Sequence, residues 1–294
     1  SPSRSHPNIV RPRGPALPGS AFDHLTRKTA VSAVRSRSFV NQLFIDGEFV
    51  PALDGATIDV ANPFDNSLLT PVALASAADV DRAVEAARRA FPAWRDTSPE
   101  LRGRLLMKLA DKMETCFDEL AELEVLDTGH PMRDARLIDV PRSAACLRYF
   151  GGMADKLFGS VVPTDKGFLN YVLREPLGVV GGIIPWNFPM TSFVWKVGPA
   201  VAAGNCIVLK PSEVTPLSAL RIAQMATEVG FPKGVINVVP GYGNTAGQRL
   251  AEHPDVNKVA FTGSTAIGRR ILAASEGNLK RLQLELGGKG PNIV

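Results

Sequence analysis

An apolar run that stops at a proline decides the fold: residues 178–189 read GVVGGIIPWNFP. Its small and branched residues suit a buried strand, and Pro185 cannot continue it. Including this one, strand-like runs span residues 178–184, 206–210, 235–239, 258–261 and 281–286. Helix-like stretches separate them, notably residues 217–229, which Gly230 closes. This alternation predicts an α/β fold with a doubly wound, Rossmann-like parallel sheet of five strands and flanking helices.

The residues before this core divide into a helical part and two hairpins. Residues 41–70 are strand-like, and Asp46-Gly47 between apolar runs is typical of a hairpin turn. Ser98 and Pro99 predict the start of a helix, and a second helix is expected from about Pro141 to residue 157. Residues 168–173 are expected to pair with residues 161–162. We therefore divide the chain into residues 41–158, a hairpin arm at 159–176 and the core at 177–286.

The charge is uneven along the 294 residues. Residues 1–40 hold seven Lys or Arg and one acid, which leaves 26 bases and 28 acids for residues 41–294. The first 40 residues are interpreted as a disordered basic leader, either a transit peptide for an organelle matrix or a trimmed or misannotated start. The near-neutral remainder has no basic stripe for nucleic acid and no uncharged apolar run that could span a membrane. We expect a cytoplasmic protein, with the organelle matrix as the alternative.

The three cysteines give no sign of a metal or disulfide site. Cys116, Cys146 and Cys206 lie 30 and 60 residues apart, without a CxxC pair or a histidine at ligand spacing. This pattern favours a reducing compartment, and it argues against a zinc site. Each cysteine is predicted to be a small buried residue.

Ligands of such sheets bind at the carboxyl ends of the strands, so the residues that follow each strand are candidates for function. Asn187, held between two prolines, could aim its amide at a developing oxyanion, or it could cap the next helix. Lys210 and Glu213 suit the hydroxyls of a ribose, and a carboxylate there repels a 2′-phosphate, which favours NAD over NADP. A surface charge pair is the alternative.

Two glycine-rich turns follow the third and fourth strands. Residues 241–246, GYGNTA, fit a dinucleotide-binding pattern, but no acid follows at the expected distance, and we favour a tight turn. Residues 261–268, FTGSTAIG, have glycines spaced as in a phosphate-binding loop, but Arg269 and Arg270 replace its Lys-Ser/Thr. Ser264 and the following helix could still meet a pyrophosphate, or Ser264 could only cap that helix.

The fifth strand ends in Glu285, which lies between apolar residues. Burial at the end of a core strand would raise its pKa and suit a general base near neutral pH. The Gly287-Gly288 pair would let the backbone approach a ligand. The alternative is a salt bridge from Glu285 to Lys289.

Taken together, these motifs resemble the aldehyde dehydrogenase superfamily over residues 41–294. The resemblance rests on PWNFP at 185–189, KPSE at 210–213, FTGS at 261–264 and LELGGK at 284–289. LRYF at 147–150 and WKVGPA at 195–200 are similar but less specific.

The resemblance implies a role for each of these residues. Asn187 would bind the oxyanion and Glu285 would activate water, while Lys210 and Glu213 would hold the adenosine ribose. Ser264 and the turn at residues 263–268 would face the pyrophosphate. The rest of the implied cofactor site, for NAD with NADP as the alternative, comprises Ile184, Pro185, Trp186, Ser212, Gly243, Phe261, Thr262, Gly263, Ile267, Gly268 and Leu286. No residue is assigned to a metal.

The reaction implied by the resemblance needs a residue that this sequence does not contain. A cysteine thiolate adds to the aldehyde to form a thiohemiacetal, hydride passes to NAD(P)+, and water releases the carboxylic acid. That cysteine should follow Glu285 in a catalytic domain of which residues 287–294 would be the start. We expect this chain to be the cofactor-binding half of a homodimer or homotetramer. The alternative is an inactive fragment that binds nucleotide, or that binds other subunits through residues 168–173.

Overall fold

The computed structural model describes residues 39–293. The predicted leader therefore lies outside the described residues, except for Phe39 and Val40. Within the described part, no helix combines the length and the apolar character that crossing a membrane requires.

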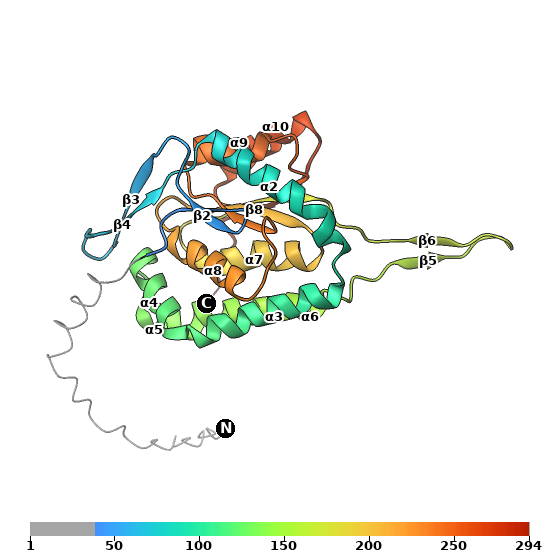
Figure 1. The fold of residues 1–294 in the computed structure, drawn as a ribbon, viewed down its shortest axis with the longest axis horizontal. Coiled ribbons are helices and arrows are strands. Elements are labelled where there is room, and N and C mark those ends of the chain that lie inside the picture. The colour runs from blue at the N-terminus through green and yellow to red at the C-terminus, as the bar shows by residue number, and fades with distance from the viewer. Residues whose placement is uncertain (1–38, 294) are drawn as a thin grey trace, which may run out of the picture. The chain divides into compact units, whose positions relative to one another are not determined.

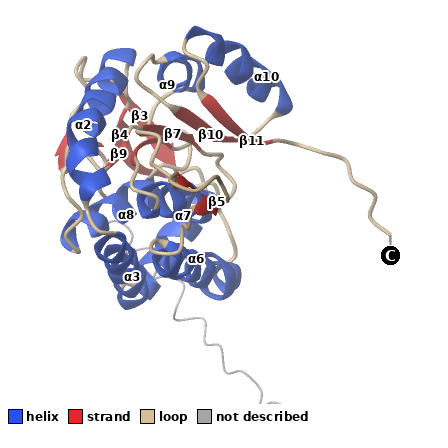
Figure 2. Cartoon of the chain, turned by 90° about the vertical axis from the view of Figure 1, so that its right-hand side faces the viewer, coloured by secondary structure: helices blue, strands red, loops and turns tan. Residues whose placement is uncertain are grey.

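A central sheet organises the body of the protein (Figures 1 and 2). All five predicted strands are present, and they pair in parallel in the order β11-β10-β7-β8-β9. Their bounds differ from the prediction by at most one residue at either end: β7 (Val179–Ile183), β8 (Cys206–Lys210), β9 (Ile236–Val238), β10 (Lys258–Thr262) and β11 (Arg281–Glu285).

The sheet is larger than the predicted five strands because a hairpin joins its edge. Strands β1 (Leu43–Ile45) and β2 (Glu48–Val50) form the predicted antiparallel hairpin, and β1 also pairs with β9 through Phe44 and Val238. Asp46 and Gly47 both adopt positive φ angles, of 54° and 77°, as a tight hairpin turn requires. The turn is anchored because the Asp46 amide donates to Asn237 Oδ1 at 3.0 Å.

Helices cover both faces of the sheet (Figure 2). One face carries α2 (Ala77–Asp96), α9 (Gln248–Glu252) and α10 (Thr265–Ala274), and the other carries α7 (Pro189–Ala202) and α8 (Leu217–Glu228). A further layer packs against α7 and α8: α3 (Pro99–Thr115), α4 (Phe117–Thr128) and α6 (Val140–Met153).

Local sequence signals explain most of these helix bounds. Ser98 caps α3 by accepting from the Leu101 amide, as predicted, and Gly230 follows α8 with a φ of 99°. Helix α6 ends four residues before the predicted bound, just after Gly151 and Gly152, which disfavour helix. Shorter elements complete the body: β3 (Thr57–Ala61), β4 (Leu68–Ala73), α5 (Met132–Asp134), the π-helices η1 (Ala135–Asp139) and η2 (Gly243–Gly247), and the 3-10 helix η3 (Ser275–Gly277).

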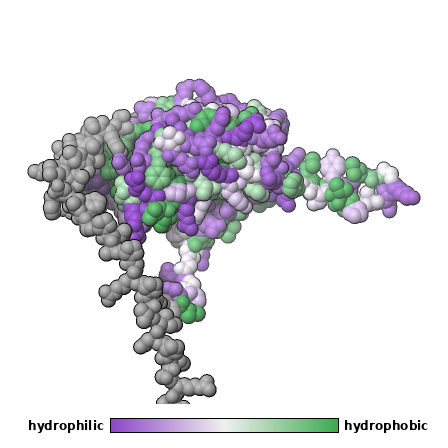
Figure 3. All heavy atoms as spheres, turned by 90° about the horizontal axis from the view of Figure 1, so that it is seen from below, coloured by the Kyte–Doolittle hydropathy of each residue, from purple (hydrophilic) through white to green (hydrophobic). Residues whose placement is uncertain are grey.

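The predicted arm is an antiparallel hairpin that projects from the body (Figure 1). It consists of β5 (Ser160–Val162) and β6 (Asn170–Val172), and every residue of both strands is exposed. Apolar side chains lie along it (Figure 3), including Val161, Phe168, Leu169 and Tyr171. An apolar hairpin that its own chain leaves bare has the character of a contact surface.

Candidate functional site

The register of the sheet gathers the predicted strand ends at one edge. Ile183 is paired with Lys210 on one side and with Phe261 on the other, and Thr262 is paired with Glu285. One step further along, the Ile184 amide donates to the Lys210 carbonyl at 3.1 Å. Four of the five motifs that follow the strands therefore start from neighbouring positions of one sheet edge.

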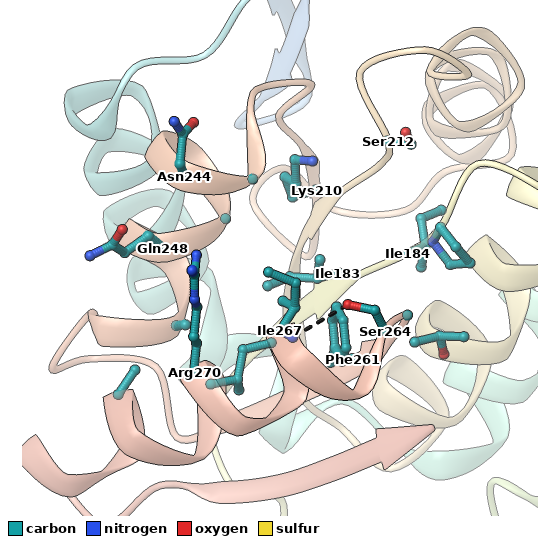
Figure 4. A pocket seen from close by; sticks show the side chains of 18 of the residues that line it. Ile183, Ile184, Lys210, Ser212, Asn244, Gln248, Phe261, Ser264, Ile267 and Arg270 are labelled. Carbon is teal, nitrogen blue, oxygen red and sulfur yellow. Dashed lines mark hydrogen bonds between the residues drawn. The ribbon is translucent and has the colours of Figure 1, made fainter. Parts of the chain in front are cut away.

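A cleft of about 840 Å³ opens beside this edge, between the strand ends and helices α9 and α10 (Figure 4). Its volume lies in the range of small-molecule and cofactor sites. Eleven of the predicted cofactor residues line it: Ile184, Pro185, Trp186, Lys210, Ser212, Gly243, Phe261, Thr262, Gly263, Ser264 and Ile267.

The wall opposite the strand ends was missed from the sequence. It is formed by Gln248, Ala251 and Glu252 of α9 together with Arg270, Ile271 and Ala274 of α10. The α10 residues follow Ile267 at intervals of three, four and seven, which places them on one helix face. The wall residues of α10 could have been predicted from this spacing, because Ile267 was already a candidate cofactor residue.

Ser264 occupies the start of α10 and faces the cleft (Figure 4). Its side chain caps the helix by accepting from the Ile267 amide at 3.3 Å. The capping alternative is thus confirmed, but it does not exclude an anion, because the hydroxyl keeps its proton to donate. The first amides of a helix also lack partners within the helix and carry its partial positive charge.

Lys210 and Glu213 form the predicted pair. Lys210 Nζ donates to Glu213 Oε2 at 3.1 Å, and the lysine side chain is only 4% exposed. Burial lowers the pKa of Lys210, and the Glu213 carboxylate opposes that shift. The alternative of a surface pair is therefore wrong for Lys210, whereas Glu213 is partly exposed and lies outside the cleft lining.

Gly268 and Leu286 also lie outside the cleft lining and contact each other. A Cβ on Gly268 would come within 2.5 Å of Leu286 Cδ2, so α10 packs closely over the end of β11. This packing explains the glycine without a ligand. Gly241 is explained in the same way, because a Cβ there would meet Ala246 at 2.6 Å, as a tight turn implies.

Asn187 lies in an exposed loop before α7. Phe188, not Asn187, is the N-terminal cap residue of α7, and no side chain caps that helix. The capping alternative for Asn187 is therefore wrong. The loop is held from behind, since the Thr215 hydroxyl donates to the Trp186 carbonyl at 3.2 Å.

The predicted burial of Glu285 is wrong for this chain. Its side chain is exposed, because β11 is the edge strand of the described sheet and pairs only with β10. The alternative salt bridge to Lys289 is not formed among the described residues either; Lys289 Nζ donates to the Gly288 carbonyl at 3.4 Å. After β11 the chain extends away from the body (Figure 2).

Lys196 is a buried lysine outside the cleft lining, and no role was predicted for it from the sequence. It lies in α7, is only 5% exposed, and burial lowers its pKa while the Glu285 carboxylate raises it. The charge of Glu285 thus acts on Lys196 of α7, the helix that begins two residues after Asn187. The stretch WKVGPA that contains Lys196 was part of the resemblance, but a lysine within an apolar helix gives no indication of its partner.

Comparison with known proteins identifies the family. The sequence profile named "Aldehyde dehydrogenase family" matches residues 49–294. The chain belongs to the aldehyde dehydrogenase family. An aldehyde dehydrogenase of Alternaria alternata is 52% identical over 254 residues, which are 86% of this chain and 51% of that protein. The chain thus spans about half the length of the curated relatives it matches.

Two solved structures of related proteins have a fold similar to that of this chain. PnpE from Pseudomonas sp. WBC-3 is 69% identical, with a TM-score of 0.84 over 85% of this chain and 51% of its own, and it has also been crystallised with nicotinamide adenine dinucleotide. A mutant of the AldA indole-3-acetaldehyde dehydrogenase of P. syringae, in complex with NAD+ and IAA, is 45% identical, with a TM-score of 0.88. That likeness covers 90% of this chain and 54% of AldA.

None of the three cysteines of this aldehyde dehydrogenase chain has the lowered thiol pKa of an activated nucleophile. Burial raises the pKa of Cys206 to about 12 and that of Cys146 to about 11, and it also raises the pKa of Cys116. All three are therefore thiols at neutral pH, whereas the thiolate is the reactive form. Cys206 is buried as predicted, but Cys116 and Cys146 are only half-buried.

Proposed function

We propose that this chain binds NAD in the cleft, and that a protein extending to the length of its relatives oxidises an aldehyde to a carboxylic acid. The observation that carries the proposal is the convergence of Lys210, Ile184, Phe261 and Ser264 on one cleft at the carboxyl edge of a parallel sheet. The NAD complex of PnpE, at 69% identity, supports the choice of cofactor.

The residues present fit a dinucleotide from one end to the other. Lys210 and Glu213 would hold the hydroxyls of the adenosine ribose, and Ser264 with the first amides of α10 would face the pyrophosphate. Ile184, Pro185 and Trp186 would line the path toward the reactive end. The Glu213 carboxylate repels a 2′-phosphate, which favours NAD over NADP.

Two polar side chains would then act at the reactive end, where bound NAD+ supplies a hydride acceptor. The Asn187 amide would donate to the oxyanion of the substrate, and the Glu285 carboxylate would take a proton from the attacking water. The Glu285 carboxylate would in turn favour the charged form of Lys196 within α7, because it raises the pKa of that lysine. The nucleophilic cysteine would come from the part of the longer protein that follows Val294.

A second role is favoured by the bare apolar hairpin. Strands β5 and β6 would contact other subunits of a homodimer or homotetramer, whether or not the chain is catalytic. The cytoplasmic location, with the organelle matrix as its alternative, stays a prediction.

Calorimetric titration of the chain with NAD tests the proposal. We expect measurable heat at millimolar NAD, with affinity weakened by the contacts that only a longer protein would supply. No heat under these conditions would overturn the proposal. We also expect no NADH from any aldehyde, and turnover that survived replacement of all three cysteines would contradict the account of the nucleophile.

A further inference from the structure

Four ionisable side chains gather inside the protein, away from the cleft. Glu124 and Asp127 lie on α4, Asp139 ends the π-helix η1, and His130 lies between these helices. Glu124 is fully buried, Asp139 is 1% exposed, and neither has a lysine or arginine partner among the described ion pairs. Buried carboxylates that lack a cation are costly, so this cluster is stabilised either by a source of positive charge or by protonation.

Three members of the cluster have their potential ligand atoms close together. A carboxylate oxygen of Glu124, an imidazole nitrogen of His130 and a carboxylate oxygen of Asp139 all lie within 4.8 Å of one another. His130 Nδ1 is 2.8 Å from Asp139 Oδ2. Asp127 is not in this group; its Oδ2 accepts instead from the Leu217 and Ser218 amides at the start of α8.

Three of the four carboxylate oxygens in this group lack hydrogen-bond partners among the described residues, although buried polar atoms almost always have one. Both oxygens of Glu124 and Oδ1 of Asp139 are buried without a hydrogen bond among the described residues. A buried acceptor left unpaired costs about 1–3 kcal/mol, and more if it is charged. Three such atoms around one imidazole indicate that something other than this chain completes the arrangement.

We propose that Glu124, His130 and Asp139 bind one divalent transition-metal ion, with Zn²⁺ as the best match. One imidazole and two carboxylates are ligands that zinc accepts, at bonds of about 2.0–2.2 Å. Such bonds set ligand atoms about 3–4 Å apart, so small side-chain rotations from the present spacing suffice. The ion would replace the present contact between His130 Nδ1 and Asp139 Oδ2, which are 2.8 Å apart, with His130 ligating through Nδ1 and Asp139 through a carboxylate oxygen.

The position of the cluster would let the ion enter from solvent and hold the loop before α7. The His130 side chain is 20% exposed, so it connects the buried carboxylates with solvent. Its ring also meets the ring of Phe188 edge-on, at 4.9 Å between centroids, and Phe188 directly follows Asn187. A bound ion would therefore fix the loop before α7 in place. The π-helix beside it fits this role, since such bulges are frequent at functional sites.

The competing state is a protonated Glu124. Burial raises its pKa well above the usual range, and Asp127 and Asp139 add to that shift. The Ser218 hydroxyl and the Met190 backbone lie near enough to oppose it slightly, yet outside hydrogen-bond geometry. A neutral Glu124 would reduce the charge without any metal, so the experiment must separate these two states. The outcome does not depend on whether the cleft binds NAD.

The metal itself is the probe. The chain, stripped with a chelator, is titrated with ZnCl₂ by calorimetry, and bound zinc is counted by mass spectrometry after gel filtration. We expect one zinc per chain with micromolar affinity or better, and much weaker binding of Mg²⁺. Glu124→Gln and Asp139→Asn should each weaken it by about tenfold or more. His253→Asn is the matched control, because this buried histidine lies outside the cluster and should leave zinc binding unchanged.

Crystals of the unsubstituted chain test whether zinc binds at this site even if a variant fails to fold. Anomalous scattering at the zinc edge should place one peak between Glu124, His130 and Asp139. The proposal is overturned if that position has no peak after soaking in ZnCl₂. It is also overturned if the infrared spectrum of the zinc-treated chain keeps a protonated-carboxyl band that Glu124→Gln removes.

Discussion

Strands β8 and β11 belong to one sheet but differ in nearly every physical respect. All five residues of β8 are buried, it has a strand on each side, and α2 and α7 pack on its faces. Strand β11 pairs only with β10, and its residues alternate between exposed and half-buried. The two strands therefore have different tasks: β8 holds the fold together, whereas β11 ends in Glu285 at the edge of the described sheet, outside the cleft lining.

The largest expected effect is on stability, and it should differ between the two strands. Leu209→Ala removes a fully buried side chain from β8 and should lower the free energy of unfolding by about 2–5 kcal/mol. Leu282→Ala in half-buried β11 should cost about 1 kcal/mol. Urea denaturation of both variants measures the difference, and equal losses would show that β11 supports the fold as strongly as β8.

The next effect is on the cofactor, at the end of β8. Lys210→Met keeps the buried carbon chain but removes the donor and the charge, so NAD should bind about tenfold more weakly. Lys233→Met is the control, because Lys233 pairs with Glu48 on the surface, away from the cleft. Calorimetry that found NAD binding equal in the two variants would remove Lys210 from the site.

A smaller change is expected in cofactor preference. Glu213→Gln removes the negative charge that would face a 2′-phosphate. The ratio of NAD affinity to NADP affinity should therefore decrease by a factor of roughly three to ten. Titrating the variant with both nucleotides gives the ratio. A preference that does not change would mean that another residue sets it.

A pH dependence of stability is expected from Lys280, just before β11. Lys280 is buried, and burial lowers its pKa from 10.5 to about 8, while its Nζ donates to the Ala251 and His253 carbonyls. Between these pH values the unfolded chain holds a proton that the folded chain has released, so stability should rise as the pH increases. Lys280→Gln should remove this rise in denaturation curves recorded from pH 8 to 10.5. A rise that persisted in the variant would assign it to another group.

The sequence predicted what local pattern controls. Each parallel strand was marked by its own apolar residues, and Asp46-Gly47 marked the first hairpin. Long-range pairing carried no such mark, so the addition of β1 to β9 through Phe44 and Val238 was missed. The exposure of Glu285 could not be predicted either, because burial depends on what packs against a strand and not on the strand alone.

The candidate site divides in the same way. Ser264, Lys210 and Ile184 followed strands and were found, whereas the α9 and α10 wall needed three-dimensional packing. The group of Glu124, His130 and Asp139 contains no cysteine, so cysteine spacing gave no sign of it.

A crystal structure of the chain with bound NAD tests the central claim most directly. We expect the adenosine ribose beside Lys210 and Glu213, the pyrophosphate at Ser264, and the nicotinamide on the side of the cleft toward Asn187 and Glu285. A dinucleotide bound elsewhere, or Asn187 and Glu285 on opposite sides of it, would contradict the account.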